Sequence, residues 1–260
     1  MKVLVTFALE NEFAPWRAMH EFRVEKWGAG EVQVANISGV EVGVLLTGMG
    51  PKRAGAAAAG VIWGDGESLS ACISSGLAGS LRPEYRVGEI LAAQSVYSQA
   101  ERADPPGRLV TCSTALISLA AREGAVVASR FYTAEQVVGT VGEKRALGHD
   151  ADAVEMESFE IVHEALAFGI PSVAIRAISD AVDDSLPIDM NRIVASDGSV
   201  SVPRVIGEVA KKPQAIPGLV RLGRNSRKAA DNLAKFLDSY VAALAASSEA
   251  LRIKATVSAS

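Results

Sequence analysis

The chain has 260 residues, 49% of them hydrophobic, and a formal net charge of -4 at pH 7. A chain of this length and apolar content can bury one large core. Its negative charge disfavours a nucleic-acid partner, since nucleic-acid binding depends on clustered Lys and Arg. The two cysteines, Cys72 and Cys112, have no partners at metal-ligand spacing. This disfavours a disulfide framework or a metal site and favours a reducing, cytoplasmic compartment.

Short apolar, β-branched runs alternate with alanine-rich stretches, a pattern typical of a largely parallel sheet covered by helices on both faces. The runs predict strands at residues 3–9, 32–37, 41–47, 71–75, 89–97, 126–132, 151–154 and 172–179. Helices are expected at residues 15–22, 52–63, 113–122, 157–167, 203–211 and 219–245. Pro15 and Pro203 each suit a first helical turn. The expected fold class is therefore α/β, a single domain with a mixed, mostly parallel central sheet flanked by helices.

One internal segment and the end of the chain carry weaker patterns. Residues 185–202 are rich in Asp, Ser, Pro and Gly and are expected to form a long loop that could act as a lid. We expect the domain to span residues 1–246, and residues 247–260 to form a flexible tail. No apolar run approaches the roughly 18 residues of a membrane-spanning helix, and Glu10 ends the first apolar run before a signal-peptide core could form. The sequence thus predicts a soluble protein.

Acidic residues directly follow three of the predicted strands. Glu12 comes after the first strand, Glu157 after the strand at 151–154, and Asp180, preceded by Ser179, after the last. Ligands of open α/β sheets bind beyond the carboxyl ends of the strands, so these acids are candidates for one site. Each acid alone is explained as well by a helix dipole, a cap or a turn. Three acids on matching strand ends favour acid-catalysed glycoside chemistry.

Residues 153–158 (AVEMES) and 170–180 (IPSVAIRAISD) closely resemble the signature of methylthioadenosine/S-adenosylhomocysteine nucleosidases and their nucleoside phosphorylase relatives. The resemblance covers about residues 1–183, and it includes ALENE at 8–12, TGMG at 47–50, SSGLAG at 74–79 and VGEI at 87–90. It implies a single α/β domain around a mixed, partly barrel-like sheet. It also implies a homodimer or larger homo-oligomer, because the family usually forms dimers or hexamers.

The resemblance implies a role for each acid in cleaving an N-glycosidic bond. Asp180 would be the general acid at purine N7, with Ser179 placing it, and Glu12 would activate the attacking water. Glu157 would bind the ribose hydroxyls, with Met156 packed against the sugar. The chemistry agrees with these roles. An anionic Glu157 would stabilise a ribosyl cation, and burial beside other carboxylates would keep a proton on Asp180.

Further residues complete the expected site. The resemblance places Gly76 beneath the base and sugar, where a tight backbone approach needs glycine. Met49 lies in the strand-to-helix glycine turn at residues 48–50, although such turns more often serve close packing alone. Leu9, Met49 and Met156 would supply an apolar wall for the 5' group of the substrate. Val137 stands where nucleosidases usually stack an aromatic side chain on adenine, so only backbone amides there would read the base edge.

One departure from the family bears on the nucleophile. Family phosphorylases hold phosphate with an arginine and a serine, but the matching positions here are Ser74 and Leu77, which favours water. Lys52, Arg53 and Arg82 lie nearby in the sequence and could restore an anion site. Basic residues after a turn are, however, more often solvated.

Three hypotheses follow. The leading one is hydrolysis of a purine nucleoside, above all a 5'-modified adenine nucleoside, with no cofactor and no metal. The second is phosphorolysis, with phosphate as the co-substrate. Residues 213–227 and the last helix are similar to the ending of hopanoid-associated nucleoside phosphorylases, which act on a nucleoside carrying a large lipid, although an ordinary amphipathic helix explains them slightly better. The third is a non-catalytic nucleoside-binding module, which the three acids disfavour.

Overall fold

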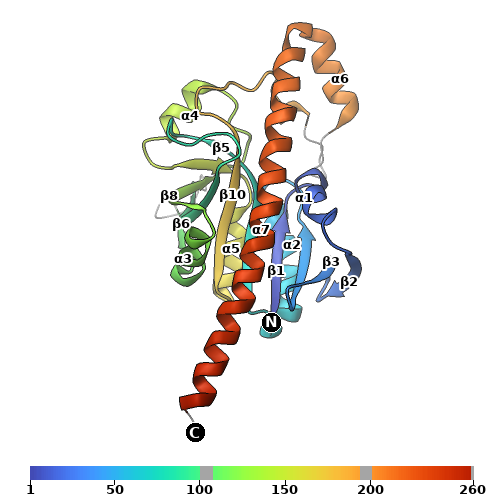
Figure 1. Ribbon diagram of the computed structural model, residues 1–260. Helices are drawn as coiled ribbons and strands as arrows, with labels where there is room; N and C mark the ends of the chain where they lie inside the picture. The colour runs from blue at the N-terminus through green and yellow to red at the C-terminus, as the bar shows by residue number, and fades with distance from the viewer. Residues whose placement is uncertain (100–107, 194–200, 259–260) are drawn as a thin grey trace.

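The computed structural model describes residues 1–99, 108–193 and 201–258, in which a mixed sheet is flanked by helices on both faces (Figure 1). In chain order the strands are β1 (Lys2–Phe7), β2 (Arg23–Trp27), β3 (Gly30–Ile37), β4 (Val40–Leu46), β5 (Ala71–Ser80), β6 (Ile90–Ser98), β7 (Arg108–Thr111), β8 (Val126–Thr133), β9 (Ala153–Glu155) and β10 (Ser172–Asp180). They are arranged in the order β10-β6-β8-β9-β5-β1-β4-β3-β2, and β7 pairs with β6.

Part of the sheet closes on itself. β10 pairs in parallel with β5 and antiparallel with β6, so that β5, β10, β6, β8 and β9 form a closed ring. β1 and β4 extend the sheet from β5 in parallel, and β3 and β2 continue it in antiparallel pairs to the far edge. The expected fold class is confirmed. Because β1, β5 and β10 are parallel, their carboxyl ends lie at the same rim of the sheet.

The helices form two layers over the sheet (Figure 1). α2 (Pro51–Asp65) and α5 (Ser158–Ala167) pack against each other on one face. α1 (Glu10–Arg17), α3 (Thr114–Arg122) and α7 (Ile216–Ser258) cover the other face. α4 (Val141–Leu147) lies near the end of β10, and α6 (Val202–Lys211) projects beyond the body beside the start of α7. The whole of β10 is buried between these layers.

An aromatic cluster fixes α1 against the sheet. The rings of Phe7 on β1 and Phe13 on α1 have centroids 5.5 Å apart, and Trp16 and Phe22 pack against Phe13 at 6.5 and 5.0 Å. Phe7, Phe13 and Trp16 are fully buried, so this contact removes large apolar surfaces from water. Since Glu12 adjoins Phe13, the cluster holds Glu12 at the end of β1.

The first helix differs from its predicted position at residues 15–22. α1 begins at Glu10, and Pro15 lies inside the helix rather than in its first turn. The early start has a local cause. Glu12, the third residue of the helix, accepts a hydrogen bond from the Leu9 backbone N–H, as the glutamate of a capping box does.

Three short elements are absent from the sequence-based prediction. β2 (RVEKW) is a charged edge strand, and its charges obscure any apolar alternation. β7 has four residues and α4 has seven, lengths at which periodicity carries little information. The start of α4 is nevertheless marked by Thr140 and Glu143, which form a capping box.

The last third of the chain also differs in its boundaries. α7 continues to Ser258, beyond its predicted end at residue 245. Of the expected loop at residues 185–202, Met190–Arg192 forms a 3-10 turn, and residues 194–200 lie outside the described residues. Within the described ranges, no helix combines the length and the apolar character of a membrane-spanning segment.

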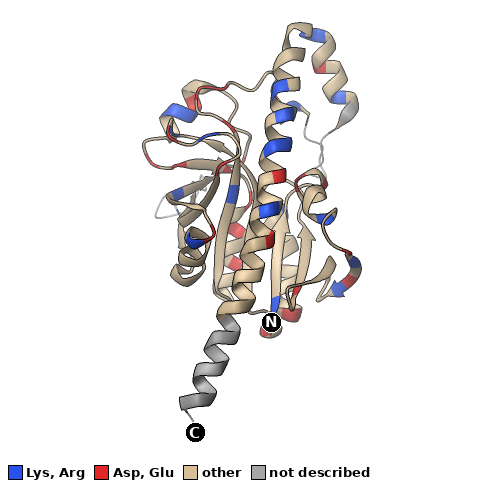
Figure 2. Cartoon of the chain, in the orientation of Figure 1, with Lys and Arg blue, Asp and Glu red and all other residues tan. Residues whose placement is uncertain are grey.

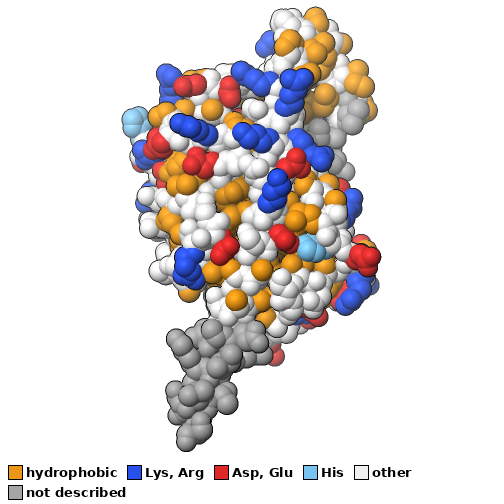
Figure 3. Space-filling model, in the orientation of Figure 1, with side chains coloured by type: hydrophobic (Ala, Val, Ile, Leu, Met, Phe, Trp, Pro, Cys, Tyr) orange, Lys and Arg blue, Asp and Glu red, His pale blue; other side chains and the backbone are white. Residues whose placement is uncertain are grey.

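The C-terminal helices expose two kinds of side chain. Figure 2 shows lysines and arginines along the outer side of α7, where Arg221, Arg224, Arg227 and Lys228 are exposed. Hydrophobic side chains are visible on the projecting end formed with α6 (Figure 3), where Ile206 is 64% exposed. The basic stretch therefore occupies solvent positions of an amphipathic helix. Its similarity to the ending of the hopanoid-associated phosphorylases stays a prediction.

Candidate active site

A pocket of about 260 Å³ lies where β1, β9 and β10 end, and segments that follow these strands form much of its wall. Eight of the nine site residues predicted from the sequence line this pocket: Glu12, Asp180, Glu157, Met156, Ser179, Met49, Leu9 and Val137. The three acids that follow three different strands therefore share one pocket.

Glu12 is buried in the pocket wall, in the first turn of α1. Its Oε2 accepts hydrogen bonds from the backbone N–H groups of Ala8 and Leu9, each at 3.1 Å. Its Oε1 accepts from the Leu77 N–H at 3.2 Å. Burial raises the pKa of Glu12, and the positive charge of Arg176 opposes the rise. Because a carboxylate oxygen has two lone pairs, Oε1 keeps one for a further donor.

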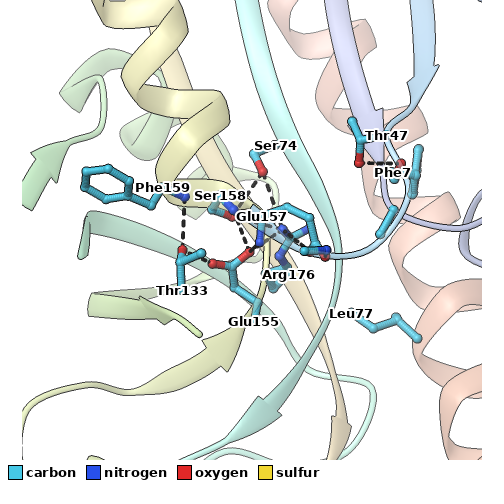
Figure 4. A network of polar contacts seen from close by, with 12 residues as sticks. Phe7, Thr47, Ser74, Leu77, Thr133, Glu155, Glu157, Ser158, Phe159 and Arg176 are labelled. Atoms are coloured by element: carbon cyan, nitrogen blue, oxygen red, sulfur yellow. Dashed lines mark hydrogen bonds and ion pairs between the residues drawn. The ribbon is translucent and has the colours of Figure 1, made fainter. Parts of the chain in front are cut away.

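A buried ion pair that the sequence analysis does not single out lies beside the pocket (Figure 4). Arg176 on β10 donates from Nη2 to Glu155 Oε2 at 2.5 Å and to Glu157 Oε2 at 3.4 Å. Glu155 also accepts from the N–H groups of Glu157 and Ser158, at 2.9 and 2.7 Å, and from the Thr133 hydroxyl. Burial opposes ionisation of Glu155, but Arg176 and these donors prevail and lower its pKa. Glu155 is thus an anion at the start of α5, where the helix dipole favours it.

Arg176 was recognisable in the sequence. It is a charged residue inside the apolar run that forms β10, and a buried charge must be paired. Such a residue therefore signals an acidic partner, and Glu155 was available in the AVEMES motif. The Nε and Nη1 atoms of Arg176 are buried and have no hydrogen-bond partner among the described residues.

Gly76 is the one predicted site residue that does not line the pocket among the described residues. It lies instead against two polar side chains. A Cβ atom at this position would be 2.5 Å from Arg176 Nη1 and 3.4 Å from Glu12 Oε2, and the φ of +146° also disfavours a side chain. Glycine here lets Arg176 and Glu12 approach each other, and the position of Gly76 beneath base and sugar stays a prediction.

Glu157 lies in the turn between β9 and α5. Its Oε1 accepts a hydrogen bond from the Gly50 N–H, just before α2, at 3.1 Å. Burial raises the pKa of Glu157 to about 8, with Glu155 and Glu12 adding to the rise and Arg176 opposing it. In the free protein Glu157 is therefore mostly protonated near neutral pH. The anionic Glu157 expected for the reaction stays a prediction, since burial favours its neutral form and Arg176, which contacts it, is shared with Glu155.

Asp180 ends β10, and its carboxylate lies between two donors. Its Oδ1 is 2.7 Å from the Ser179 hydroxyl oxygen, and its Oδ2 forms an ion pair with Lys144. The expectation was that other carboxylates would adjoin Asp180. The charged group that contacts it is instead a lysine of α4, a helix that the sequence analysis does not predict.

Val137 lies in the pocket wall, as expected for the segment that would meet the base. Its N–H donates to Asn191 Oδ1 at 2.8 Å, and its C=O accepts from Asn191 Nδ2 at 3.1 Å. The Asn191 amide thus occupies the backbone N–H and C=O of Val137, which are the groups that would bind the edge of a base. No sequence signal marks Asn191, which lies within the expected loop at residues 185–202.

Much of the remaining wall of the pocket is apolar, although Asn11, Gln136 and Ser226 also line it. The expected residues Leu9, Met49 and Met156 are joined there by Leu186, Met190 and Leu222. Leu222 belongs to α7, so the C-terminal helix contributes directly to the pocket. Sequence reasoning misses these three additions because a hydrophobic residue in a loop or on a helix has no pattern that distinguishes a pocket from the core.

In the part of the chain that the structure describes, acidic but not basic side chains line the pocket. Among the described residues, its charged lining side chains are Glu12, Glu155, Glu157 and Asp180. Lys52 and Arg53, which were candidates for an anion site, are exposed at the start of α2, and Arg82 pairs with Asp152 at 2.9 Å. None of the three lines the pocket. The described part of the chain also contains no cluster of three or more His, Cys, Asp or Glu side chains suited to a metal ion.

Comparison with known families agrees with this arrangement. The model of the phosphorylase superfamily matches residues 2–211, which is most of the chain. This chain belongs to the phosphorylase superfamily. The match runs from β1 through α6 and so includes every strand end that supplies an acid to the pocket, whereas α7 lies beyond it.

Solved structures share the fold of this superfamily member. A 5'-methylthioadenosine/S-adenosylhomocysteine nucleosidase from Helicobacter pylori, with butyl-thio-DADMe-Immucillin-A, is 20% identical at a TM-score of 0.71, covering 93% of this chain and 97% of that chain. The same nucleosidase from Neisseria meningitidis, with methylthio-immucillin-A, is 22% identical at a TM-score of 0.68, and the match covers 93% of this chain and 98% of that chain. Futalosine hydrolase from Helicobacter pylori is 20% identical at a TM-score of 0.69, and the match covers 93% of this chain and 97% of that chain. At such identities the comparison establishes the shared fold.

Proposed function

We propose that this protein hydrolyses the N-glycosidic bond of a purine nucleoside, and that its substrate is an adenine nucleoside with an apolar 5' group. The groups that line the pocket carry the proposal, because four of them are carboxyl groups and, among the described residues, none is a lysine or arginine. Carboxylates stabilise a developing ribosyl cation and repel a phosphate dianion. Water is therefore the nucleophile that suits this pocket.

The ribose is assigned to Glu157 and Met156. Glu157 is neutral in the free protein near neutral pH because its pKa is raised to about 8. The reactive fraction of the protein is the one in which Glu157 has already lost this proton to solvent, because the anion stabilises a ribosyl cation forming beside it. Glu157 therefore interacts more strongly with the transition state than with the substrate, which is the condition for lowering the barrier.

The attacking water is assigned to Glu12. Glu12 lines the pocket, and its Oε1 accepts from the Leu77 N–H and keeps a lone pair for a water molecule. Water bound there donates a hydrogen bond to Glu12. Glu12 takes the proton as oxygen bonds to the anomeric carbon. Attack on the face opposite the leaving base inverts that carbon.

The departing base is assigned to Asp180, with Ser179 holding the carboxyl group in place. Protonation of N7 lets the purine leave as a neutral molecule, and a positioned general acid contributes about 100- to 10,000-fold to such a step. The adenine edge would bind the backbone of Val137 after displacing the Asn191 amide, because both require the same donor and acceptor.

The apolar wall supports a substrate with a thioether or alkyl group at its 5' position. The nucleosidases from Helicobacter pylori and Neisseria meningitidis were solved with butyl-thio and methylthio analogues, which agrees with this assignment. For the present chain, the support comes from Leu9, Met49 and Met156. These side chains offer no hydrogen-bonding partner to a 5' hydroxyl other than the weak acceptor of methionine sulfur.

An ultraviolet assay of base release from methylthioadenosine, with and without phosphate, tests the proposal. We expect equal release in both conditions, and a loss of about 100-fold or more in Asp180→Asn, whose amide keeps the shape but is a poor proton donor. Release that requires phosphate would favour phosphorolysis. Binding without any release of base would favour the non-catalytic nucleoside-binding module.

We also propose, from the family resemblance, that the protein is a cytoplasmic homodimer or larger homo-oligomer. Light scattering of the purified protein measures the assembly. A monomer at the concentrations used for catalysis would contradict the oligomer.

A further inference from the structure

Lys144 is a buried cation to which the proposed reaction so far gives no role. Its side chain is 0% exposed, and its Nζ donates to Asp180 Oδ2 and, at 2.9 Å each, to the carbonyl oxygens of Ala181 and Asp184. An ammonium group has three donors, so all of them are used. A buried charge is costly unless it is paired, and the anionic partner of Lys144 is the carboxylate assigned to the leaving base.

Lys144 is held behind Asp180 by a short helix fixed at both ends. At the start of α4, Thr140 Oγ1 accepts from the Glu143 N–H at 3.2 Å. At its end, Gly148 packs so closely on the Leu81 carbonyl that a Cβ atom would lie 2.4 Å from the oxygen. Lys144 itself does not line the pocket in the described structure. It can therefore act on a substrate only through Asp180.

The same oxygen of Asp180 adjoins both Lys144 and the pocket. A Cβ atom on Gly79, which lines the pocket, would lie 3.0 Å from Asp180 Oδ2. On the other side, Ser179 Oγ lies 2.7 Å from Asp180 Oδ1 and 3.2 Å from the Ala78 carbonyl oxygen. Ser179 has one hydroxyl proton for these two acceptors. Its contact with Asp180 thus suits both the ionised and the protonated carboxyl group.

We propose that Lys144 is a positioning residue that supplies, through Asp180, the proton taken by the leaving purine. This inference rests on the proposed hydrolysis. The ammonium passes a proton from Nζ to Asp180 Oδ2, and Asp180 passes it to purine N7. Meanwhile the bond between the anomeric carbon and N9 breaks, and its electron pair moves into the base.

The protons balance over the cycle. The attacking water bonds to the anomeric carbon and gives one proton to Glu12, while the Lys144 and Asp180 pair gives one proton to the base. After the products leave, Glu12 releases its proton to solvent and Lys144 takes one up. The net reaction consumes one water and forms the free base and the free sugar, with no other reactant.

Changing the leaving group separates this role from a structural one. Lys144→Met is assayed on methylthioadenosine, whose base needs a proton to leave, and on the corresponding nitrophenyl methylthioriboside, whose nitrophenolate leaves as an anion. We expect kcat on methylthioadenosine to fall about 100-fold with little change in KM, and kcat on the nitrophenyl riboside to fall less than about threefold. Lys144→Arg should likewise lower kcat on methylthioadenosine much more than kcat on the nitrophenyl riboside, because a guanidinium keeps the ion pair but does not give up a proton.

Arg145→Met is the matched control. Arg145 adjoins Lys144 on α4 and binds Asp183 through an exposed ion pair at 2.7 Å, so its removal should leave kcat on both substrates within about twofold. Circular dichroism verifies the fold of each variant. If Lys144→Met does not fold, kcat of Lys144→Arg on the two substrates decides whether Lys144 has the proposed role.

Two outcomes overturn the role of Lys144 while leaving the proposed function intact. One is an equal loss on both substrates in the folded lysine variants, which would mark a structural role. The other is unchanged turnover of methylthioadenosine in those variants. Wild-type protein that cleaves neither substrate would overturn the proposed function itself, and this inference with it.

Discussion

Arg176 Nη2 lies 2.5 Å from Glu155 Oε2, and both side chains are buried beside the pocket. Taking two charges out of water is costly, and their attraction offsets this only with good geometry and further hydrogen bonds. Glu155 has those bonds, from the N–H groups of Glu157 and Ser158. The pair joins β10 to the turn between β9 and α5 and so fixes the carboxyl end of both strands.

Breaking this pair should destabilise the protein strongly. Arg176→Met leaves Glu155 as a buried carboxylate without its cation, at a cost of about 3 to 5 kcal/mol in the free energy of unfolding. Replacing both residues, as Arg176→Met with Glu155→Leu, should cost less than Arg176→Met alone, because no unpaired charge remains. Urea denaturation measures both. A single variant as stable as the wild type would contradict the assigned pairing.

The activity should depend on pH through Glu157. Its pKa is raised to about 8, so below that pH the neutral form predominates and the anion that stabilises a ribosyl cation is scarce. Raising the pH increases the anion fraction, and kcat/KM should therefore rise about tenfold per pH unit from roughly pH 6 toward 8 and then level off. Glu12, whose pKa burial also raises, acts in the same direction. A profile that is flat over this range would contradict the role of Glu157.

Removing the Asn191 amide should favour substrate binding. Asn191→Ala frees the Val137 N–H and C=O, which the substrate otherwise has to take over. Since a net hydrogen bond contributes about 1 kcal/mol, KM for an adenine nucleoside should fall by roughly fivefold with little change in kcat. Steady-state kinetics measure both constants. An increase in KM would mean that Asn191 itself binds the substrate.

The apolar wall should discriminate at the 5' position. Burying a hydroxyl unpaired costs about 1 to 3 kcal/mol, so 5'-thio compounds should exceed adenosine in kcat/KM by roughly 5- to 150-fold. Methylthioadenosine, S-adenosylhomocysteine, adenosine and inosine are compared under one set of conditions. Preference for adenosine or inosine over both thioethers would move the assignment to general purine nucleoside cleavage.

The sequence predicted those parts of the structure that depend on local patterns. The buried strand β10 follows from a largely apolar run that includes Arg176, and Glu12, Glu157 and Asp180 stand out because each acid comes soon after a predicted strand. Two of the acids, Glu12 and Asp180, belong to the carboxyl ends of the parallel strands β1 and β10, which lie at one rim. Glu157 follows β9, which pairs antiparallel with β5, and it reaches the pocket through the turn into α5.

The missed features depend on contacts between distant segments. Lys144 is 36 residues from Asp180 and Asn191 is 54 residues from Val137, and neither pair shares a motif. The expected protonation states also required the structure. Lys144 beside Asp180, and Arg176 shared between Glu155 and Glu157, set the charges of the pocket.

Turnover of methylthioadenosine in heavy-oxygen water, with excess phosphate present, tests the central claim most directly. The account predicts adenine and free methylthioribose, with one heavy oxygen on the anomeric carbon, because water is the nucleophile in a pocket lined by acids. Mass spectrometry of the sugar product measures the label. Methylthioribose 1-phosphate without heavy oxygen at that carbon would contradict the account.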